Sequence, residues 1–154
     1  MSEISEDRFY SFEKQEVIVE NFYSTGYILD IGGGGEGIIG KLKGKEVVAI
    51  DPNKQELEEA PAGPLKIVMD AKNLQFIDNT FSVATSFFTL MYIRKADHQR
   101  VFNEVFRVLI PAGLFLIWDV NFPKRQKKKR YSSHSSHRKI TFRRNLYELW
   151  SGMA

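Results

Sequence analysis

The chain has 154 residues, which is long enough for one domain with a buried core. Its composition, 43% hydrophobic and 27% charged with a net charge of +3, is that of an ordinary soluble domain. No apolar run approaches the roughly 20 residues of a membrane helix, and the acidic, polar start is unlike a secretory signal peptide. The absence of cysteine excludes disulfides and thiolate metal sites, and the three histidines are too scattered for a zinc site. We therefore expect a cytoplasmic protein with no membrane span and no metal.

The positive charge is concentrated at the carboxyl end. Residues 124–154 contain ten Lys or Arg and one Glu, whereas residues 1–123 contain twelve Lys or Arg against eighteen Asp or Glu. We predict a folded domain over residues 1–123, followed by a basic, low-complexity tail over residues 124–154. The net positive charge belongs to that tail, so it says little about what the domain binds.

Helices and strands alternate along the first half of the chain. Residues 6–23 have apolar side chains at mixed spacing and predict one or two helices. The apolar YILDI of residues 27–31 predicts a strand, and the GGGGEG of residues 32–37 predicts a glycine loop directly after it. IIGKLKG, residues 38–44, predicts a short helix that ends at its last glycine. EVVAID, residues 46–51, is rich in β-branched residues and predicts a second strand.

The second half continues this alternation. PNKQELEEA, residues 52–60, predicts a helix with proline at its start. LKIVMD, residues 65–70, predicts a third strand, and the nearly continuous apolar character of residues 81–90 suits a fourth that is buried on both faces. Residues 97–109 predict an amphipathic helix, after which Pro-Ala-Gly turns the chain into a fifth strand over residues 114–120. The pattern predicts an α/β fold with a doubly wound, Rossmann-like, mostly parallel sheet of about five strands and helices on both faces.

The glycine loop is the first functional signal. Without a Cβ, the backbone of such a loop can approach a ligand closely. The pattern G-x-G-x-x-G can be read as Gly32-Gly34-Gly37 or as Gly35-Gly37-Gly40. Taken alone, it is compatible with NAD, FAD or S-adenosylmethionine, and also with a plain glycine-rich turn.

An aspartate lies at or next to the end of each of the first three predicted strands. Asp51 lies about twenty residues beyond the glycine loop, where a carboxylate can accept both ribose hydroxyls or cap the next helix. Asp30 lies inside the strand end, just before the glycines, where it would repel a pyrophosphate and attract a sulfonium or an ammonium group. Asp70 is placed to accept a hydrogen bond from an adenine amino group. Each aspartate could instead cap a strand end, but all three together favour a positively charged adenosyl ligand.

Five stretches share their order and character with one family. ILDIGGGGEG, VVAIDP and IVMDA resemble its first three motifs, LQFIDNTFSVATSFFTLMYI its fourth-strand region, and EVFRVLIPAGLFLIWD its following helix, turn and fifth strand. Over residues 26–120 the chain thus resembles class I S-adenosylmethionine-dependent methyltransferases, and is similar to the small-molecule enzymes of the ubiquinone and menaquinone biosynthesis type. The resemblance implies S-adenosylmethionine as cofactor, S-adenosylhomocysteine as product, and a small-molecule methyl acceptor as partner.

The resemblance also implies a set of cofactor-binding residues. The methionine part would face Asp30 and the glycines, the ribose Asp51, and the adenine Asp70, while the reacting methyl group would lie near the end of the fourth strand. The full set is Asp30, Gly32, Gly34, Gly35, Asp51, Pro52, Asp70, Ala71, Ser86 and Phe87. Phe87 suits the core equally well.

Three positions depart from the family pattern. The glycine loop is one residue longer than usual, so that its third glycine is either Gly35 or Gly37. Ser82 replaces a common aspartate before the fourth strand, and Ala112 replaces a common glycine in the turn. Of these departures, the longer loop is the one expected to touch the cofactor site.

Methyl transfer requires a nucleophile aligned with the S–CH3 bond, and positioning with exclusion of water can supply much of the rate. The sequence shows no obligatory base. Candidates are His98 at the start of the helix predicted at 97–109, Asp119 at the end of the fifth strand, and Tyr92, where the family often has histidine. His98 could instead be a solvated helix-start residue, and Tyr92 a packing residue.

The tail raises alternatives. Family members continue after the fifth strand with a helix and an antiparallel strand pair, whereas residues 124–154 are basic and serine-rich. We therefore expect the final strand pair to be missing, and we hypothesise a truncated or frameshifted reading frame. The chain could then be a non-catalytic S-adenosylmethionine-binding protein that has lost its substrate half. It could also be a nucleic-acid-associated methyltransferase that grips phosphates with residues 124–130, or, as a more distant alternative, a nicotinamide dehydrogenase.

Overall fold

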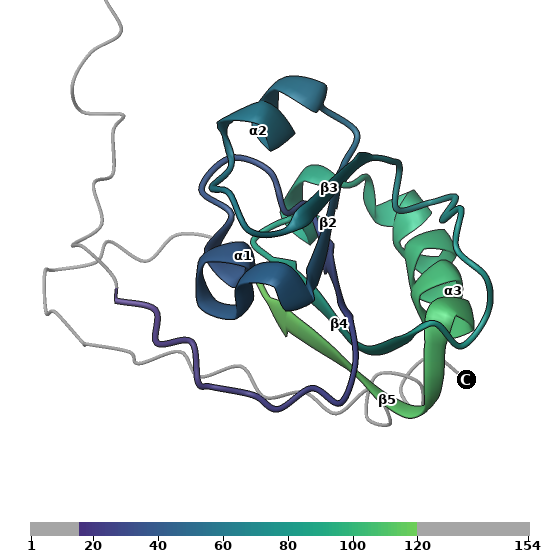
Figure 1. Cartoon of the computed structure of the whole chain (residues 1–154). Helices are drawn as coiled ribbons and strands as arrows, with labels where there is room; N and C mark the ends of the chain where they lie inside the picture. Colours follow the sequence, from purple (N-terminus) through teal and green to yellow (C-terminus); the bar gives the residue numbers. More distant parts are fainter. Residues whose placement is uncertain (1–15, 120–154) are drawn as a thin grey trace, which may run out of the picture.

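Five parallel strands form a single sheet in the computed structural model, which describes residues 16–119. The strands are β1 (Ile28–Ile31), β2 (Val47–Asp51), β3 (Leu65–Val68), β4 (Phe81–Phe87) and β5 (Leu109–Trp118). Their order across the sheet is β3-β2-β1-β4-β5, and every neighbouring pair is parallel (Figure 1). The predicted doubly wound α/β fold is confirmed.

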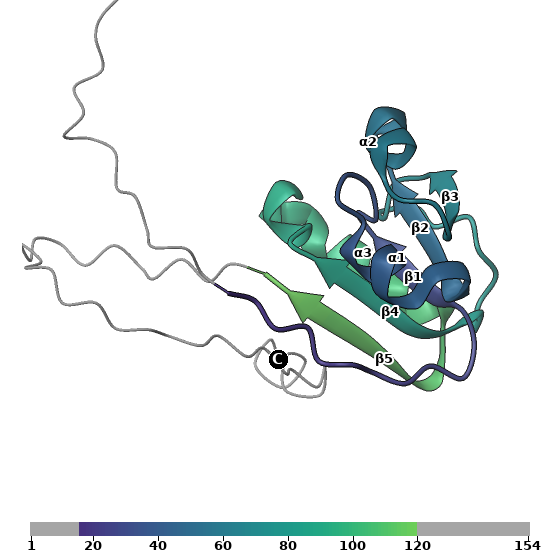
Figure 2. The same ribbon diagram turned by 60° about the vertical axis from the view of Figure 1, so that its left-hand side comes forward.

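Helices pack on both faces of the sheet (Figure 2). The α-helices are α1 (Ile38–Lys43), α2 (Lys54–Glu59) and α3 (His98–Val108), and short 3-10 turns are η2 (Gly44–Glu46), η3 (Leu90–Tyr92) and η4 (Lys95–Asp97). Ile39 of α1 and Leu57 of α2 pack with Ile28 of β1 in one core cluster. The opposite face carries α3, as expected when right-handed crossovers run in both directions from the middle of a parallel sheet.

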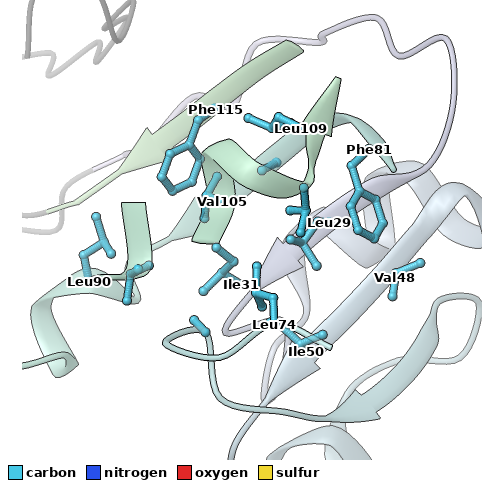
Figure 3. Close-up of a cluster of buried hydrophobic side chains, with 14 residues drawn as sticks. Leu29, Ile31, Val48, Ile50, Leu74, Phe81, Leu90, Val105, Leu109 and Phe115 are labelled. Atoms are coloured by element: carbon cyan, nitrogen blue, oxygen red, sulfur yellow. The ribbon is translucent and has the colours of Figure 1, made fainter. Parts of the chain in front are cut away.

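The larger core cluster lies between the sheet and α3 (Figure 3). Leu29 and Ile31 of β1 point into it, together with Val105 of α3, and all three side chains are fully buried. Ile28 points to the other face, because successive side chains of a strand alternate between the two faces. A central strand buried on both faces therefore needs apolar residues at nearly every position, which is why the sequences ILDI and VVAI predict strands.

The prediction of helices over residues 6–23 is wrong for the part that the structure describes. Residues 16–27 contain no helix, and Val17, Ile18 and Tyr23 are exposed. Phe22 packs against Trp118 with 6.4 Å between ring centroids. The apolar residues of this segment have mixed spacing, so they do not form the continuous stripe that would hold a helix against the sheet.

The predicted turn at Pro-Ala-Gly is an irregularity within β5. Phe81 pairs with Leu109 and Val83 pairs with Leu114, so five residues of β5 advance past two of β4. The strand nevertheless runs through this stretch. Ala112 takes up the distortion with a φ of 62°, in the left-handed region that favours glycine.

This conformation gives a first stability prediction. Replacing Ala112 with glycine should increase the free energy of unfolding by about 0.5–1 kcal/mol, because the strain of a left-handed alanine exceeds the entropy that glycine loses on folding. Urea titration measures the change. Ala62→Gly is the matched control, since Ala62 is exposed and has no positive φ. It should lower stability slightly, and a loss at Ala112 as large as at Ala62 would contradict the prediction.

Arg107 of α3 fixes the connection between β3 and β4. Its guanidinium donates to the carbonyl oxygens of Leu74 and Phe76, at 2.7 Å each, and to the carboxylates of Glu104 and Asp78, at 2.9 Å each. Glu104 in turn accepts the Leu74 N–H at 2.7 Å, and its hydrogen bond to Arg107 lowers the pKa of the Glu104 carboxyl. Without a helix of its own, this connection is held in place by the side chains of α3.

Two sets of predictions fall on residues beyond those described. The basic tail of residues 124–154, including the phosphate-gripping run, lies outside the described residues, as do residues 6–15 of the predicted helices. Between residues 16 and 119, none of the helices has the length and apolar character needed to cross a membrane.

Candidate functional site

A cavity of about 960 Å³ opens at the carboxyl ends of the strands. Four segments line it: the glycine loop after β1, the start of α2 after β2, residues 69–72 after β3, and the segment from Phe87 to Asp97 after β4. Strands β1 and β4 are neighbours, and the chain leaves them toward opposite faces of the sheet. In open α/β sheets, this reversal point is where ligands bind.

The glycine loop is held against the neighbouring strand and helix. The N–H groups of Gly32 and Gly33 both donate to the Ile50 carbonyl, at 2.9 and 3.0 Å, and the Gly35 N–H donates to the Glu56 carbonyl at 2.8 Å. A Cβ on Gly34 would lie 2.6 Å from the Glu56 Cβ. The extra residue of the loop is therefore accommodated by close contact with α2, which glycine alone permits.

Asp30 is the buried charge of the cavity wall. Its side chain is 2% exposed, and its Oδ1 accepts a 2.8 Å hydrogen bond from the Thr85 hydroxyl of β4. Burial raises the pKa of Asp30 from 3.8 to about 7, and the Thr85 hydrogen bond opposes that rise. With such a pKa the carboxyl group is only partly ionised near neutral pH, and a bound cation would stabilise its ionised form.

Asp51 ends β2 beside the glycine loop. Its Oδ1 accepts the Asn53 N–H at 2.8 Å, and its Oδ2 lies near Gly34. The cap of α2 is Asn53, whose side chain accepts the Gln55 N–H at 3.0 Å, so the helix begins two residues after Pro52 rather than at it. Because Asn53 caps the helix, Asp51 keeps an oxygen on the cavity side for a ligand.

Asp70 belongs to an ion-pair chain along the cavity rim. It accepts the backbone N–H of Lys72 at 2.9 Å and lies 3.4 Å from the Lys72 ammonium. Lys72 also lies 3.9 Å from Asp97, which accepts the Arg94 Nε–H at 2.9 Å. These ion pairs join the loop after β3 to η4. All four side chains line the cavity, as does the buried Ala71.

The end of β4 carries the aromatic wall. Phe87 lines the cavity and meets Phe88 edge-to-face, with 4.8 Å between ring centroids. Phe88 has a φ of 51°, which is rare for an aromatic residue and marks local strain of the kind found at functional sites. Tyr92 also lines the cavity, and its side chain is 82% exposed.

Nine of the ten cofactor-binding residues expected from the sequence line this one cavity, and Ser86 does not. Ser86 is fully buried, and its hydroxyl has no hydrogen-bond partner within residues 16–119. It points to the opposite face of β4 from Phe87, because neighbouring residues of a strand alternate. Its predicted contact near the reacting methyl group is thus not supported by its position.

Two of the three candidate bases, His98 and Asp119, are not among the residues that line the cavity. His98 Nε2 lies 3.1 Å from the Leu90 carbonyl and 3.0 Å from the Ile93 carbonyl, so this nitrogen is a donor that braces the segment around η3. Asp119 follows β5 and is likewise not among the residues that line the cavity. Tyr92 alone of the three candidates reaches it. Two backbone carbonyls thus engage His98 Nε2 in this structure, and its role as a base stays a prediction.

Sequence reasoning missed several cavity residues. Glu56, Lys72, Arg94, Phe88 and Thr89 all line the cavity. Glu56 and Lys72 follow predicted strand ends within a few residues, which was the available signal. Arg94 and Thr89 reach the cavity only because residues 88–97 fold back over the glycine loop, which no local pattern reveals.

An open parallel sheet whose glycine loop and cavity meet where the strand order reverses is the arrangement of Rossmann-like cofactor-binding domains. Within that class, the chain belongs to the methyltransferase domain family, which matches residues 29–117. The family implies S-adenosylmethionine as the cofactor.

Individual relatives agree with this assignment. A sterol 4-C-methyltransferase of Caenorhabditis elegans is 34% identical over 108 residues, which are 61% of this chain and 31% of the relative. A solved protein of Pyrococcus horikoshii is 31% identical with a TM-score of 0.55, over 60% of this chain and 48% of the other. An S-adenosylmethionine-dependent methyltransferase of Mesorhizobium loti shares the fold, at 23% identity and a TM-score of 0.52, over 62% and 48%. The chain thus spans half or less of the length of these relatives.

Proposed function

We propose that the chain binds S-adenosylmethionine in this cavity and transfers its methyl group to a small-molecule acceptor. The observation that carries the proposal is the position of Asp30, Asp51 and Asp70, which stand at three neighbouring strand ends around one cavity. Together with the methyltransferase family match over residues 29–117, this position favours an adenosyl cofactor.

The residues present fit that cofactor. Six acidic side chains line the cavity against two basic ones, and the acidic set is Asp30, Glu36, Asp51, Glu56, Asp70 and Asp97. Such a wall favours a ligand with positive charge and disfavours the pyrophosphate of a dinucleotide. Glycine at position 34 keeps the loop backbone close to α2 and Asp51, and the backbone of the loop itself lines the cavity.

Each part of the cofactor has a matching partner. Asp30 and the glycine loop would hold the amino and sulfonium groups of the methionine part, because a buried carboxylate interacts most strongly with a cation. Asp51 would accept the ribose hydroxyls, with Pro52 beside the adenine. Asp70 and Ala71 would frame the adenine, and Asp70 would then contact both the adenine and the Lys72 ammonium.

The chain's own contribution to the reaction would be orientation and exclusion of water. When bound, the cofactor supplies an electrophilic methyl group on a sulfonium. Phe87, Phe88 and Tyr92 form the wall at the end of β4, where apolar surface would exclude water and hold an acceptor in line. His98 Nε2 is engaged by backbone carbonyls. An acceptor that ionises by itself would require no base from the described residues.

Calorimetry with S-adenosylmethionine, S-adenosylhomocysteine and NAD tests the cofactor assignment. The protein should bind the two adenosyl compounds and not NAD. Asp51→Ala should weaken S-adenosylmethionine binding by roughly 10–100-fold, the loss expected for hydrogen bonds to a charged group. Glu58→Ala, an exposed position of α2 that pairs with Lys54 and does not line the cavity, is the control and should bind normally. A preference for NAD, or an Asp51→Ala variant that binds like the wild type, would overturn the proposal.

Turnover separates catalysis from binding alone. Incubation with labelled S-adenosylmethionine and a panel of small-molecule acceptors, sterols included because of the nematode relative, should transfer the label to one class. Tight binding combined with no transfer to any acceptor would favour the non-catalytic alternative.

A further inference from the structure

We propose that Thr85 is a positioning residue, whose hydroxyl holds the Asp30 carboxylate in place for the cationic part of the cofactor. This assignment rests on the proposed function, and it names a residue that neither the family motifs nor the glycine loop point to.

The pair is built into the centre of the sheet. Asp30 and Thr85 are register partners on the adjacent strands β1 and β4, and the exposed fractions of their side chains are 2% and 0%. The Thr85 Oγ1 donates to the Asp30 Oδ1 at 2.8 Å, and the next acceptor, the Leu29 carbonyl, is 3.4 Å away. A valine has the same shape and would suit a buried strand better, so the hydroxyl is explained by its hydrogen bond to Asp30.

The hydrogen bond fixes the orientation of the Asp30 carboxylate. Oδ1 accepts the Thr85 hydroxyl, and Oδ2 lies beside the glycine loop, 2.8 Å from where a Cβ on Gly33 would stand. Rotation of the carboxylate would break the hydrogen bond to Thr85. Asp30 is itself among the residues that line the cavity, so its carboxylate is held in one orientation in the cavity wall.

Within residues 16–119, no charged side chain is placed to hold the Asp30 carboxylate as Thr85 does. The strand partner of Asp30 on β2 is Ala49, and the glycine loop beside it brings no charge before Glu36. On α1, Lys43 is engaged by the Asn21 side chain and the Phe22 carbonyl. The remaining charged groups of the cavity are Glu36, Asp51, Glu56, Asp70, Lys72, Arg94 and Asp97. The two causes that shift the pKa of Asp30 are burial, which raises it, and the Thr85 hydroxyl, which lowers it.

The test compares Thr85→Val with Thr85→Ser. The ¹³C signal of the Asp30 carboxyl, followed by NMR against pH in the ligand-free protein, should show a pKa about one pH unit higher in Thr85→Val, because the ionised form loses its donor. Thr85→Ser keeps the hydroxyl and should titrate like the wild type. Ser82→Ala is the matched control, since it removes a hydroxyl at the other end of the same strand, where Ser82 bonds to Ser24.

The same variants are then titrated with S-adenosylmethionine at several pH values. For Thr85→Val, affinity at pH 7 should fall by about 3–10-fold, and the deficit should shrink toward pH 9, where Asp30 is ionised in both proteins. A purely structural role for Thr85 would instead lower affinity equally at every pH. An Asp30 pKa that is unchanged in Thr85→Val overturns the inference. A wild type that binds no S-adenosylmethionine at any pH overturns the proposed function, whatever the titration of Asp30 shows.

Discussion

The Asp30→Asn variant should be more stable than the wild type at pH 8 and should bind S-adenosylmethionine far more weakly. Burial raises the pKa of Asp30 to about 7 in the folded protein, whereas the unfolded chain ionises near 3.8. Between these two values the folded state holds the proton more tightly, so stability falls as the pH rises and the full penalty is present above pH 7. The difference corresponds to roughly 4 kcal/mol as an upper bound, and asparagine avoids it because it carries no charge.

Binding should move in the opposite direction. A cationic ligand stabilises the ionised carboxylate, so wild-type affinity for S-adenosylmethionine should increase as the pH rises through 7. Asparagine offers no negative charge, and its affinity should fall by roughly 10–100-fold and lose this pH dependence, the loss expected for one charge-assisted hydrogen bond.

Urea unfolding at pH 4, 6 and 8 and calorimetry over the same range provide both measurements. Glu58→Gln, an exposed carboxylate paired with Lys54 on α2, is the control and should change neither quantity appreciably. An Asp30→Asn protein that is less stable than the wild type at pH 8 would contradict the account of Asp30 as a buried charge that destabilises the folded state.

The strands were the most predictable part of this fold, for a physical reason. A strand buried on both faces must be apolar at nearly every position, so the segments around Leu29, Val48 and Val83 are distinct in the sequence itself. Residues 16–23 have no such requirement. Whether they form a helix depends on what covers them, and the sequence of the segment does not contain that information.

Pro-Ala-Gly in β5 shows the limit of local signals. Proline and glycine favour a turn wherever they occur, but here the chain on both sides pairs with β4, and the strand absorbs the extra residues as an irregularity. The deciding interaction is with a distant strand. It becomes visible only when the register between Phe81 and Val83 is known.

The candidate site divides along the same line. Asp30, Asp51 and Asp70 were predictable, because parallel strands bring their carboxyl ends to one edge and each aspartate closes a strand or follows it closely. Ser86 and Phe87 were not distinguishable, since a shift of one residue decides which of the two faces the cavity. His98 looked like a free helix-start residue, and only the fold of residues 90–93 shows that carbonyls occupy its ring nitrogen.

Gly32→Ala should be the most destabilising single substitution in the glycine loop. Gly32 has a φ of 72°, which costs alanine roughly 1–2 kcal/mol. In addition, a Cβ at this position would lie 2.2 Å from the Thr89 Oγ1 and 2.4 Å from its Cγ2. Forcing these atoms apart should add about 1–3 kcal/mol, because the Thr89 segment is also held by the hydrogen bond from its Oγ1 to the Phe87 carbonyl.

Gly35→Ala separates the two effects. Gly35 has a φ of 57°, similar to that of Gly32, but the atom near its ideal Cβ is Oε2 of the exposed Glu56 side chain, at 2.8 Å, which can move away. Its alanine variant should therefore lose mainly the backbone part, about 1–2 kcal/mol, while Gly32→Ala loses about 2–5 kcal/mol in urea unfolding. Combining Gly32→Ala with Thr89→Gly removes the colliding side chain and should recover the steric part, so the two substitutions should be coupled. Equal losses at Gly32 and Gly35, or additive effects of Gly32→Ala and Thr89→Gly, would contradict the close packing of Thr89 against Gly32 and with it the position of the segment after β4 in the cavity wall.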